Sequence, residues 1–230
     1  MIVSVVVPMF RTAPMLDELH RRIRESIESD ATSLEILLVD DACDEGSGDA
    51  AAALAASSTA VRLLTHTTNQ GQHRAIRTGL SEATGEIVVI LDADLQDPPE
   101  AIPVLTAELD LTDSHAVFAG RRGRYQRSGR TLTGRAFKRA LAAIAGTPID
   151  GGGFVALSRA GADATLLTSF DDFYLLTAIA AGGVRMSSIP IERGVRREGK
   201  SAMSSRARIS LARRGLTMAW QIRRAQASES

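Results

Sequence analysis

The sequence predicts a single α/β domain, with a mostly parallel central sheet and helices on both of its faces. Short apolar runs rich in β-branched residues alternate with longer segments of helical character, an alternation typical of parallel βα units. Runs such as EILLV and EIVVIL are apolar after their first residue, which favours strands that are covered on both faces. A length of 230 residues with 44% hydrophobic content is enough for one substantial core.

The apolar runs place the strands along the chain, and the segments between them are predicted to be helices. The expected strands are residues 3–7, 35–39, 61–65, 87–91, 116–119 and 184–190. The expected helices are residues 14–29, 48–57, 72–83, 100–109, 131–145 and 173–182. Residues 1–203 would form the domain, and residues 204–230 a basic amphipathic C-terminal segment.

Two pairs of acids follow strands of this predicted sheet. Asp40 and Asp41 come directly after EILLV, and Asp92 and Asp94 come after EIVVIL. The carboxyl ends of parallel strands meet at one edge, where open α/β sheets bind their ligands. The sequence therefore predicts a ligand site at this edge.

The most specific motif is DADLQDPP, residues 92–99. Asp92 and Asp94, with the amide oxygen of Gln96, are hard oxygen ligands that suit Mg²⁺ or Mn²⁺, and such a cation typically also holds substrate phosphates. The alternative is that an acid at a strand end only caps the next helix. The position between an apolar strand and a proline-led helix start favours the metal site.

Two neighbouring loops could complete a nucleotide site. The carboxylates of Asp40 and Asp41 could accept a hydrogen bond from a uracil or guanine ring, and Phe10, after the first strand, could stack on the base. Gly71 and Gln72 open a helix whose N-terminus favours anionic groups. The alternatives are ordinary turn chemistry for the acidic pair and an ordinary strand-to-helix turn for the glycine loop.

Three later segments combine charge with glycine. Residues 120–139 are rich in arginine and follow the fifth expected strand, so they could neutralise phosphates as well as form a solvated loop. Residues 150–154, DGGGF, predict a flexible turn with one acid. Residues 196–201, RREGKS, bring together cations, a glycine and a hydroxyl, which are the ingredients of a phosphate site.

Charge is unevenly distributed along a chain whose formal net charge is zero. Residues 196–224 hold eight arginines and one lysine but only one acid. Their second half, residues 206–224, predicts an amphipathic helix that could lie on an anionic membrane surface. The alternatives are that this helix packs back on the domain or pairs in a homodimer. We expect no nucleic-acid partner.

Cysteine usage and hydropathy indicate a compartment. The single cysteine, Cys43, cannot form an internal disulfide, and no basic region precedes the first apolar run. No window approaches the roughly 18 to 20 continuous apolar residues that a membrane-spanning helix needs. We therefore expect a cytoplasmic protein that does not span a bilayer by itself.

The motifs VVVPMF, EILLVDD, NQGQHRAIRTGL, GEIVVILDADLQDPPEAIP and RREGKS, in that order, resemble the family 2 glycosyltransferases. The likeness is to the polyprenyl-phosphate and dolichyl-phosphate hexose synthases in particular, and it covers nearly the whole chain. It implies the GT-A (Rossmann-like) fold and an inverting, metal-dependent hexosyltransferase that uses a UDP or GDP sugar.

The resemblance also implies roles for individual residues. Asp92, Asp94 and Gln96 match the metal ligands of that family, and Asp40 matches the acid that reads the nucleobase. Nucleotide-sugar contacts are expected from Pro8, Phe10, Asp40, Asp41, Gly71, Gln72, Asp92 and Ala93. Catalytic roles are expected for Asp94, Asp150, Arg121 and Arg196, and contacts to phosphate or acceptor for Arg130, Arg135, Lys200 and Ser201.

The sequence departs from the family pattern near the acceptor. Arg11 stands where an asparagine is usual, and Ala202 and Met203 replace the basic and aromatic residues that often follow Ser201. Two acceptors are therefore open. The favoured one is a polyprenyl phosphate, reached by an enzyme that is peripheral on the inner face of the cell membrane, alone or with a membrane-protein partner.

A lipid phosphate is already ionised and needs no strong base, so arginines that position it would carry much of the work. The alternative is a soluble hydroxyl acceptor, for which Asp150, Asp171 or Asp172 would be the candidate general base. A more remote alternative is a phosphoacceptor signalling domain, which also places acids at the strand ends of a doubly wound sheet.

Overall fold

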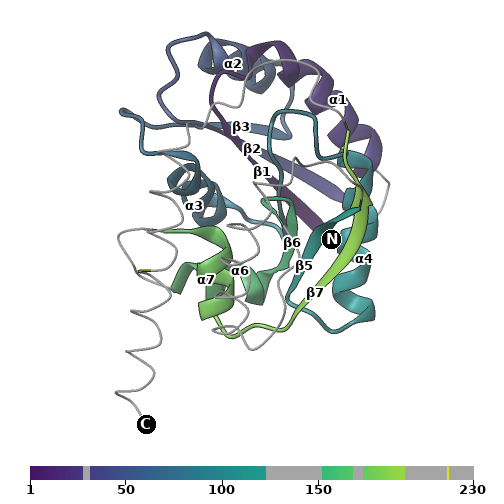
Figure 1. Ribbon diagram of the computed structural model, residues 1–230. Helices are drawn as coiled ribbons and strands as arrows, with labels where there is room; N and C mark the ends of the chain where they lie inside the picture. The colour runs from purple at the N-terminus through teal and green to yellow at the C-terminus, as the bar shows by residue number, and fades with distance from the viewer. Residues whose placement is uncertain (28–31, 123–151, 168–172, 195–216, 218–230) are drawn as a thin grey trace.

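The computed structural model describes residues 1–27, 32–122, 152–167, 173–194 and 217. The strands of these residues form one sheet in the order β3-β2-β1-β4-β6-β5-β7 (Figure 1). Their bounds are β1 Ile2–Met9, β2 Ser33–Asp40, β3 Val61–Thr65, β4 Ile87–Ile90, β5 Ala116–Arg122, β6 Val155–Ser158 and β7 Met186–Glu192.

The sheet is mostly parallel, as the sequence predicts. β1 pairs in parallel with both β2 and β4, and β2 pairs in parallel with β3. β6 is antiparallel to β4 on one side and to β5 on the other, and β7 runs parallel to β5 at the edge. Among the described strands, β6 alone therefore runs against the rest.

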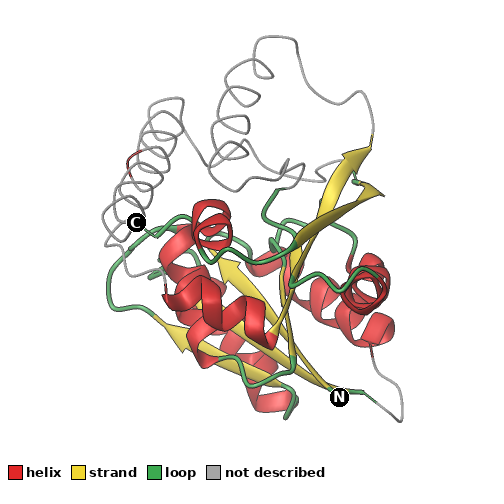
Figure 2. Cartoon of the chain, turned by 90° about the horizontal axis from the view of Figure 1, so that it is seen from below, coloured by secondary structure: helices red, strands yellow, loops and turns green. Residues whose placement is uncertain are grey.

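Helices cover both faces of this sheet, in three layers (Figure 2). One face is covered by α1, α2 and α4, and the other by α3, α6 and α7. The helical bounds are η1 Ala13–Met15, α1 Leu16–Ile27, α2 Ser47–Ser57, α3 Gln72–Glu82, η2 Pro99–Ala101, α4 Ile102–Leu111, α6 Arg159–Leu167 and α7 Leu175–Ala181.

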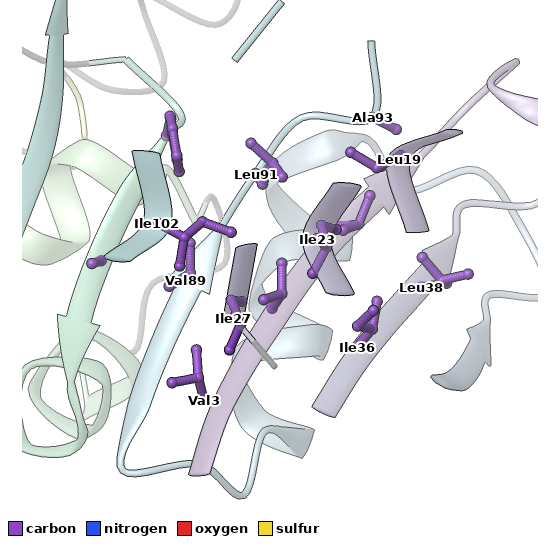
Figure 3. Packing of buried hydrophobic residues seen from close by; sticks show 14 of the residues in the cluster. Val3, Leu19, Ile23, Ile27, Ile36, Leu38, Val89, Leu91, Ala93 and Ile102 are labelled. Atoms are coloured by element: carbon purple, nitrogen blue, oxygen red, sulfur yellow. The ribbon is translucent and has the colours of Figure 1, made fainter. Parts of the chain in front are cut away.

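Alternation along the central strands explains why there are two cores. In β1, Val5 and Val7 join the cluster on the α1 side, while Val6 joins the cluster on the α3 side. Figure 3 shows the first cluster, in which Leu19 and Ile23 of α1 lie over the strands. All these side chains are removed from water, and burial of each such residue contributes on the order of 1.5–3 kcal/mol.

Helix α3 packs closely on the sheet at Gly79. A Cβ atom added at Gly79 would overlap Cγ1 of Val6 and lie 3.1 Å from Cγ2 of Val39. Glycine at this position lets the helix settle onto β1 and β2, and this contact fixes where the N-terminus of α3 lies.

Most predicted elements are confirmed, and the second half of the sheet shows the differences. The sequence does not predict β6 and α6, because the strand has only four residues and follows a glycine run that is typical of a turn. The strand expected at residues 184–190 is found as β7, Met186–Glu192, where it pairs with β5 along its whole length. The helix expected at residues 131–145 lies outside the described residues, as does the boundary proposed at residue 203. In the described part of the chain, no helix combines the length and apolarity needed to cross a membrane.

Candidate active site

Four loops leave the carboxyl ends of β1, β2, β3 and β4 at the same edge of the sheet. Each contains a residue with a left-handed backbone: Arg11 (φ 58°), Ala42 (φ 54°), Gly71 (φ 91°) and Leu95 (φ 56°). For residues other than glycine this conformation costs on the order of 1–3 kcal/mol, and such strain is found where a functional site demands it. Strain of this kind at three neighbouring loops marks this edge as the candidate site.

The loop after β4 carries an excess of negative charge. Burial raises the pKa of Asp92 to about 6, and the charges of Asp97 and Asp94 add to the increase, while Arg193 and Gln72 oppose it. A carboxylate that resists ionisation for these reasons would be stabilised by a cation close to it. The turn therefore fits a divalent cation electrostatically.

The donor set of this turn also fits a metal that keeps other ligands. Asp92 and Asp94 supply carboxylate oxygens, and the backbone N–H of Gln96 donates to Asp94 Oδ1 at 3.1 Å, which fixes the turn between them. Among the described residues no group of three acids, histidines or cysteines forms a complete cage. Mg²⁺ and Mn²⁺ suit such an open site, because substrate phosphates and water can complete their coordination. A role for the Gln96 side chain as a metal ligand stays a prediction.

Helix α3 contacts the acidic turn through its first residue. Gln72 Nε2 donates a hydrogen bond of 2.6 Å to Asp92 Oδ1. Gly153, which precedes β6, lies on another side of Asp92, where an added Cβ would be 3.5 Å from the same oxygen. The structure thus brings the predicted Gln72 loop and the DADLQDPP turn together, and adds the start of β6 to them.

Asp41 organises the loop that precedes α3. Its side chain is buried, and its Oδ1 accepts from the backbone N–H of Gln70 at 2.8 Å while Oδ2 accepts from Gly71 at 2.7 Å. His66 Nδ1 lies 2.8 Å from the same carboxylate, and its Nε2 lies 2.9 Å from Thr78 Oγ1. The protein itself therefore uses both oxygens of Asp41, and the residue positions the glycine loop. Its predicted contact to nucleotide stays a prediction.

Asp40 is the last residue of β2, and its side chain lies close to the beginning of α2. Its buried side chain accepts a hydrogen bond from the Cys43 N–H at 3.3 Å, and a Cβ added at Gly48 would lie 2.9 Å from its Oδ2. Asp40 thus makes the kind of turn hydrogen bond that ordinary turn chemistry predicts for it. Nucleobase recognition by Asp40 would be an additional role, and it stays a prediction.

The loop after β1 faces Asp40 across the edge. Met9 pairs in register with Asp40, and Phe10, the next residue, is 38% exposed. The Arg11 guanidinium lies 5.2 Å from the Phe10 ring centroid and forms an ion pair of 2.9 Å with Glu45. Phe10 is therefore available at this edge for stacking, whereas Pro8 is buried within β1.

His73 joins α3 to the segment before α7. Its ring centroid is 4.4 Å from that of Tyr174, and its Nδ1 accepts a long hydrogen bond of 3.5 Å from the Leu175 N–H. Burial lowers the pKa of His73 to about 4 and raises the pKa of Tyr174 to about 12. Both rings are neutral at physiological pH, so this contact is a packing contact beside the site.

Comparison with known proteins agrees with this geometry. A model of the glycosyl transferase family 2 matches residues 4–163, which include most of β1, the strands β2 to β6, the acidic turn and the α3 loop described above. The chain belongs to glycosyl transferase family 2. This membership is the reason to set aside the phosphoacceptor alternative.

Solved structures share the fold of this glycosyltransferase at low sequence identity. A mannosyltransferase from Pyrobaculum calidifontis, in complex with GDP-Man and Mn²⁺, is 22% identical with a TM-score of 0.61, over 99% of this chain and 75% of that one. Glucosyl-3-phosphoglycerate synthase from Mycobacterium tuberculosis, in complex with Mn²⁺, UDP and phosphoglyceric acid, is 19% identical with a TM-score of 0.67, over 96% of this chain and 78% of that one.

A third structure, mannosyl-3-phosphoglycerate synthase from Rubrobacter xylanophilus, is 20% identical with a TM-score of 0.64, over 99% of this chain and 75% of that one. These likenesses confirm the expected GT-A fold.

Several predicted residues of the glycosyltransferase lie outside the described residues. Arg121 lies within β5, where its backbone pairs with Ile191, and its side chain is not described. Residues 123–151 contain Arg130, Arg135 and Asp150, residues 168–172 contain Asp171 and Asp172, and residues 195–216 contain Arg196, Lys200 and Ser201. All three segments lie outside the described residues. Their roles remain predictions.

Sequence reasoning missed two features of the site. His66 supports Asp41, and Arg193 binds both oxygens of Asp97. A lone histidine after a strand and an arginine after β7 carry no motif, and in each case the partner is distant in the sequence. Asp97 lies within DADLQDPP, but the motif indicates no separate role for it.

Proposed function

We propose that this family 2 glycosyltransferase moves a hexosyl unit, with inversion at the anomeric carbon, from a nucleoside diphosphate sugar to a polyprenyl phosphate, and that it requires Mg²⁺ or Mn²⁺. The observation that carries this proposal is the acidic turn at the carboxyl edge of the sheet. There Gln72 Nε2, from α3, donates a hydrogen bond of 2.6 Å to Asp92 Oδ1. Asp92 and Asp94 would hold the cation, and Gln96 would be a further ligand.

The cation would supply a positive charge that stabilises the diphosphate as it leaves. The protein residues around it have separate tasks. Gln72 donates a hydrogen bond to Asp92, and Asp41 holds the loop that ends in Gly71, so that α3 begins beside the acidic turn. The backbone N–H groups at a helix N-terminus favour anionic ligands such as donor phosphates.

The donor is proposed to be a UDP or GDP sugar. Support comes from the solved structures, one of which contains GDP-Man and another UDP, each with Mn²⁺. In this chain, Phe10 directly follows β1 and Asp40 ends the neighbouring strand β2, so the exposed ring could stack on a base and the carboxylate could accept from it. Both contacts are part of the proposal.

Two acceptors remain candidates. The motifs DADLQDPP and RREGKS and the basic residues 206–224 support a polyprenyl phosphate, which would place the enzyme peripherally on the inner face of the cell membrane. The second candidate is a soluble hydroxyl acceptor, with Asp150, Asp171 or Asp172 as general base. It is supported by the relatives that are named phosphoglycerate synthases.

One labelled-sugar experiment separates these outcomes. The purified full chain is incubated with Mn²⁺ and radiolabelled UDP-glucose or GDP-mannose, and with either polyprenyl phosphate in detergent micelles or 3-phosphoglycerate. Label that partitions into the organic phase only when lipid, metal and protein are all present supports the lipid reaction. Label transferred only to 3-phosphoglycerate supports the soluble acceptor. Absence of transfer and of donor hydrolysis with both nucleotide sugars contradicts the proposed activity.

A further inference from the structure

The end of β7 meets the acidic turn directly. Arg193, the first residue after β7, directs Nε and Nη2 of its guanidinium to Oδ1 and Oδ2 of Asp97. The Asp97 side chain is 1% exposed and that of Arg193 is 21% exposed. A bidentate arginine–carboxylate contact with one partner fully buried has one favoured geometry. It therefore fixes the position of the two side chains as well as pairing their charges.

A second contact joins the same two segments. The Gly194 N–H donates a hydrogen bond of 2.9 Å to the carbonyl oxygen of Gln96. Leu95, the residue before Gln96, has the left-handed backbone that turns the chain toward Asp97. The turn between Asp94 and Asp97 is therefore held from outside by two successive residues, one through its side chain and one through its backbone.

Asp97 is oriented away from a metal-ligand role by this contact. Both of its carboxylate oxygens face Arg193, whereas Asp94 Oδ1 accepts a hydrogen bond from within the turn. The three acids of DADLQDPP thus separate into two that are proposed to bind a cation and one that anchors the turn.

We propose that Arg193 is a positioning residue of the metal turn, which acts by binding Asp97 and so holds residues 94–97 in the conformation that presents Asp92 and Asp94 to the cation. This inference rests on the proposed function. Groups that orient metal ligands from behind typically contribute about 10- to 100-fold to metal affinity. The contribution expected for Arg193 is in that range.

The direction of the effect distinguishes positioning from simple charge. Arg193 is a cation near the metal site, so if it acted only through its charge, its removal would tighten Mn²⁺ binding. If it positions the turn, its removal loosens Asp94 and weakens Mn²⁺ binding in spite of the added negative charge. The two accounts therefore predict changes of opposite sign.

The experiment measures Mn²⁺ binding to the full chain without donor, from the loss of the free Mn²⁺ signal in electron paramagnetic resonance. The variants are Arg193→Met and Arg193→Lys. Arg193→Met removes both the charge and the bidentate contact to Asp97, whereas Arg193→Lys keeps the charge and loses the bidentate contact. We expect at least about tenfold weaker binding for Arg193→Met and an intermediate loss for Arg193→Lys. If Arg193→Met does not fold by circular dichroism, Arg193→Lys decides by the same measurement.

Arg185 supplies a matched control at the other end of β7. It precedes the strand as Arg193 follows it, and it forms an exposed ion pair of 2.5 Å with Asp113. Arg185→Met should leave Mn²⁺ binding unchanged. Unchanged or tighter binding in the Arg193 variants, or an equal loss in Arg185→Met, overturns the inference while the proposed function stands. Absence of Mn²⁺ binding in the unmodified protein instead overturns the proposed metal site, and the inference with it.

Discussion

Gln72 Nε2 and Asp92 Oδ1 lie 2.6 Å apart, so the first residue of α3 is joined to the acidic turn that follows β4. Gln72 belongs to a helix on one face of the sheet, and Asp92 belongs to the loop that follows β4. Their contact makes the position of α3 a condition for the geometry of the proposed metal site.

Replacement of Gln72 tests this contact. Gln72→Leu should lower metal-dependent donor turnover by about 10- to 100-fold, because the carboxylate that it orients would become free to rotate. The unfolding midpoint should barely change, since the Gln72 residue is exposed. Ser81→Ala, at the exposed far end of the same helix, is the control and should leave turnover unaltered. Equal turnover in the two variants would argue that the hydrogen bond has no part in the site.

The close packing of α3 on the sheet gives a second prediction. Gly79→Ala should reduce the free energy of unfolding by about 1–3 kcal/mol, because the new methyl group overlaps Val6. Since α3 must shift to accommodate it, Mn²⁺ binding should weaken as well. Urea denaturation and Mn²⁺ titration of the same sample measure both quantities. A fully stable variant would show that the helix is not fixed by this contact.

The two neighbouring acids after β2 are expected to respond differently. Asp41→Asn places an amide NH₂ among the N–H groups of Gln70 and Gly71, so the free energy of unfolding should fall by about 1–3 kcal/mol. Asp40→Asn weakens a longer hydrogen bond, the one from the Cys43 N–H at 3.3 Å, so this variant should be less destabilised but should bind UDP or GDP more weakly. Denaturation and nucleotide titration together test this pattern, and the reverse pattern would refute the assigned roles.

His73 should make stability depend on pH. Its pKa is lowered to about 4 in the folded protein, so between pH 4 and about 6.5 the unfolded chain binds more protons, and stability falls as the pH falls. The contribution is at most about 3 kcal/mol. His73→Phe keeps a ring against Tyr174 without the titration, so its stability should fall less over this range. Parallel losses in both proteins, measured by urea denaturation at several pH values, would exclude this origin.

The parallel half of the fold was predictable from local sequence. β1, β2 and β4 contain continuous apolar runs with side chains buried on both faces of the sheet, and that pattern does not depend on distant residues. β6 was not predictable in this way. It is four residues long and runs antiparallel between β4 and β5, and that place in the sheet is decided by its partners.

The same reason limits what could be predicted of the site. Asp92, Asp94 and Gln72 lie at strand and helix ends, so the rule for parallel sheets brings them to one edge. The partners of Asp97 and Asp41 are side chains 96 and 25 residues away, and no local pattern indicates them. What the sequence leaves out is therefore the set of residues that hold the ligands in position.

Donor turnover by Asp94→Ala, with Mn²⁺ present, tests the central claim most directly. We expect hydrolysis and transfer from UDP-glucose or GDP-mannose to fall to background, while the circular dichroism spectrum and the unfolding midpoint stay close to those of the unmodified protein. The reason is that Asp94 lies at a loop edge and contributes little to either core. Mn²⁺-dependent turnover retained in this variant would contradict the assignment of the acidic turn as the metal site.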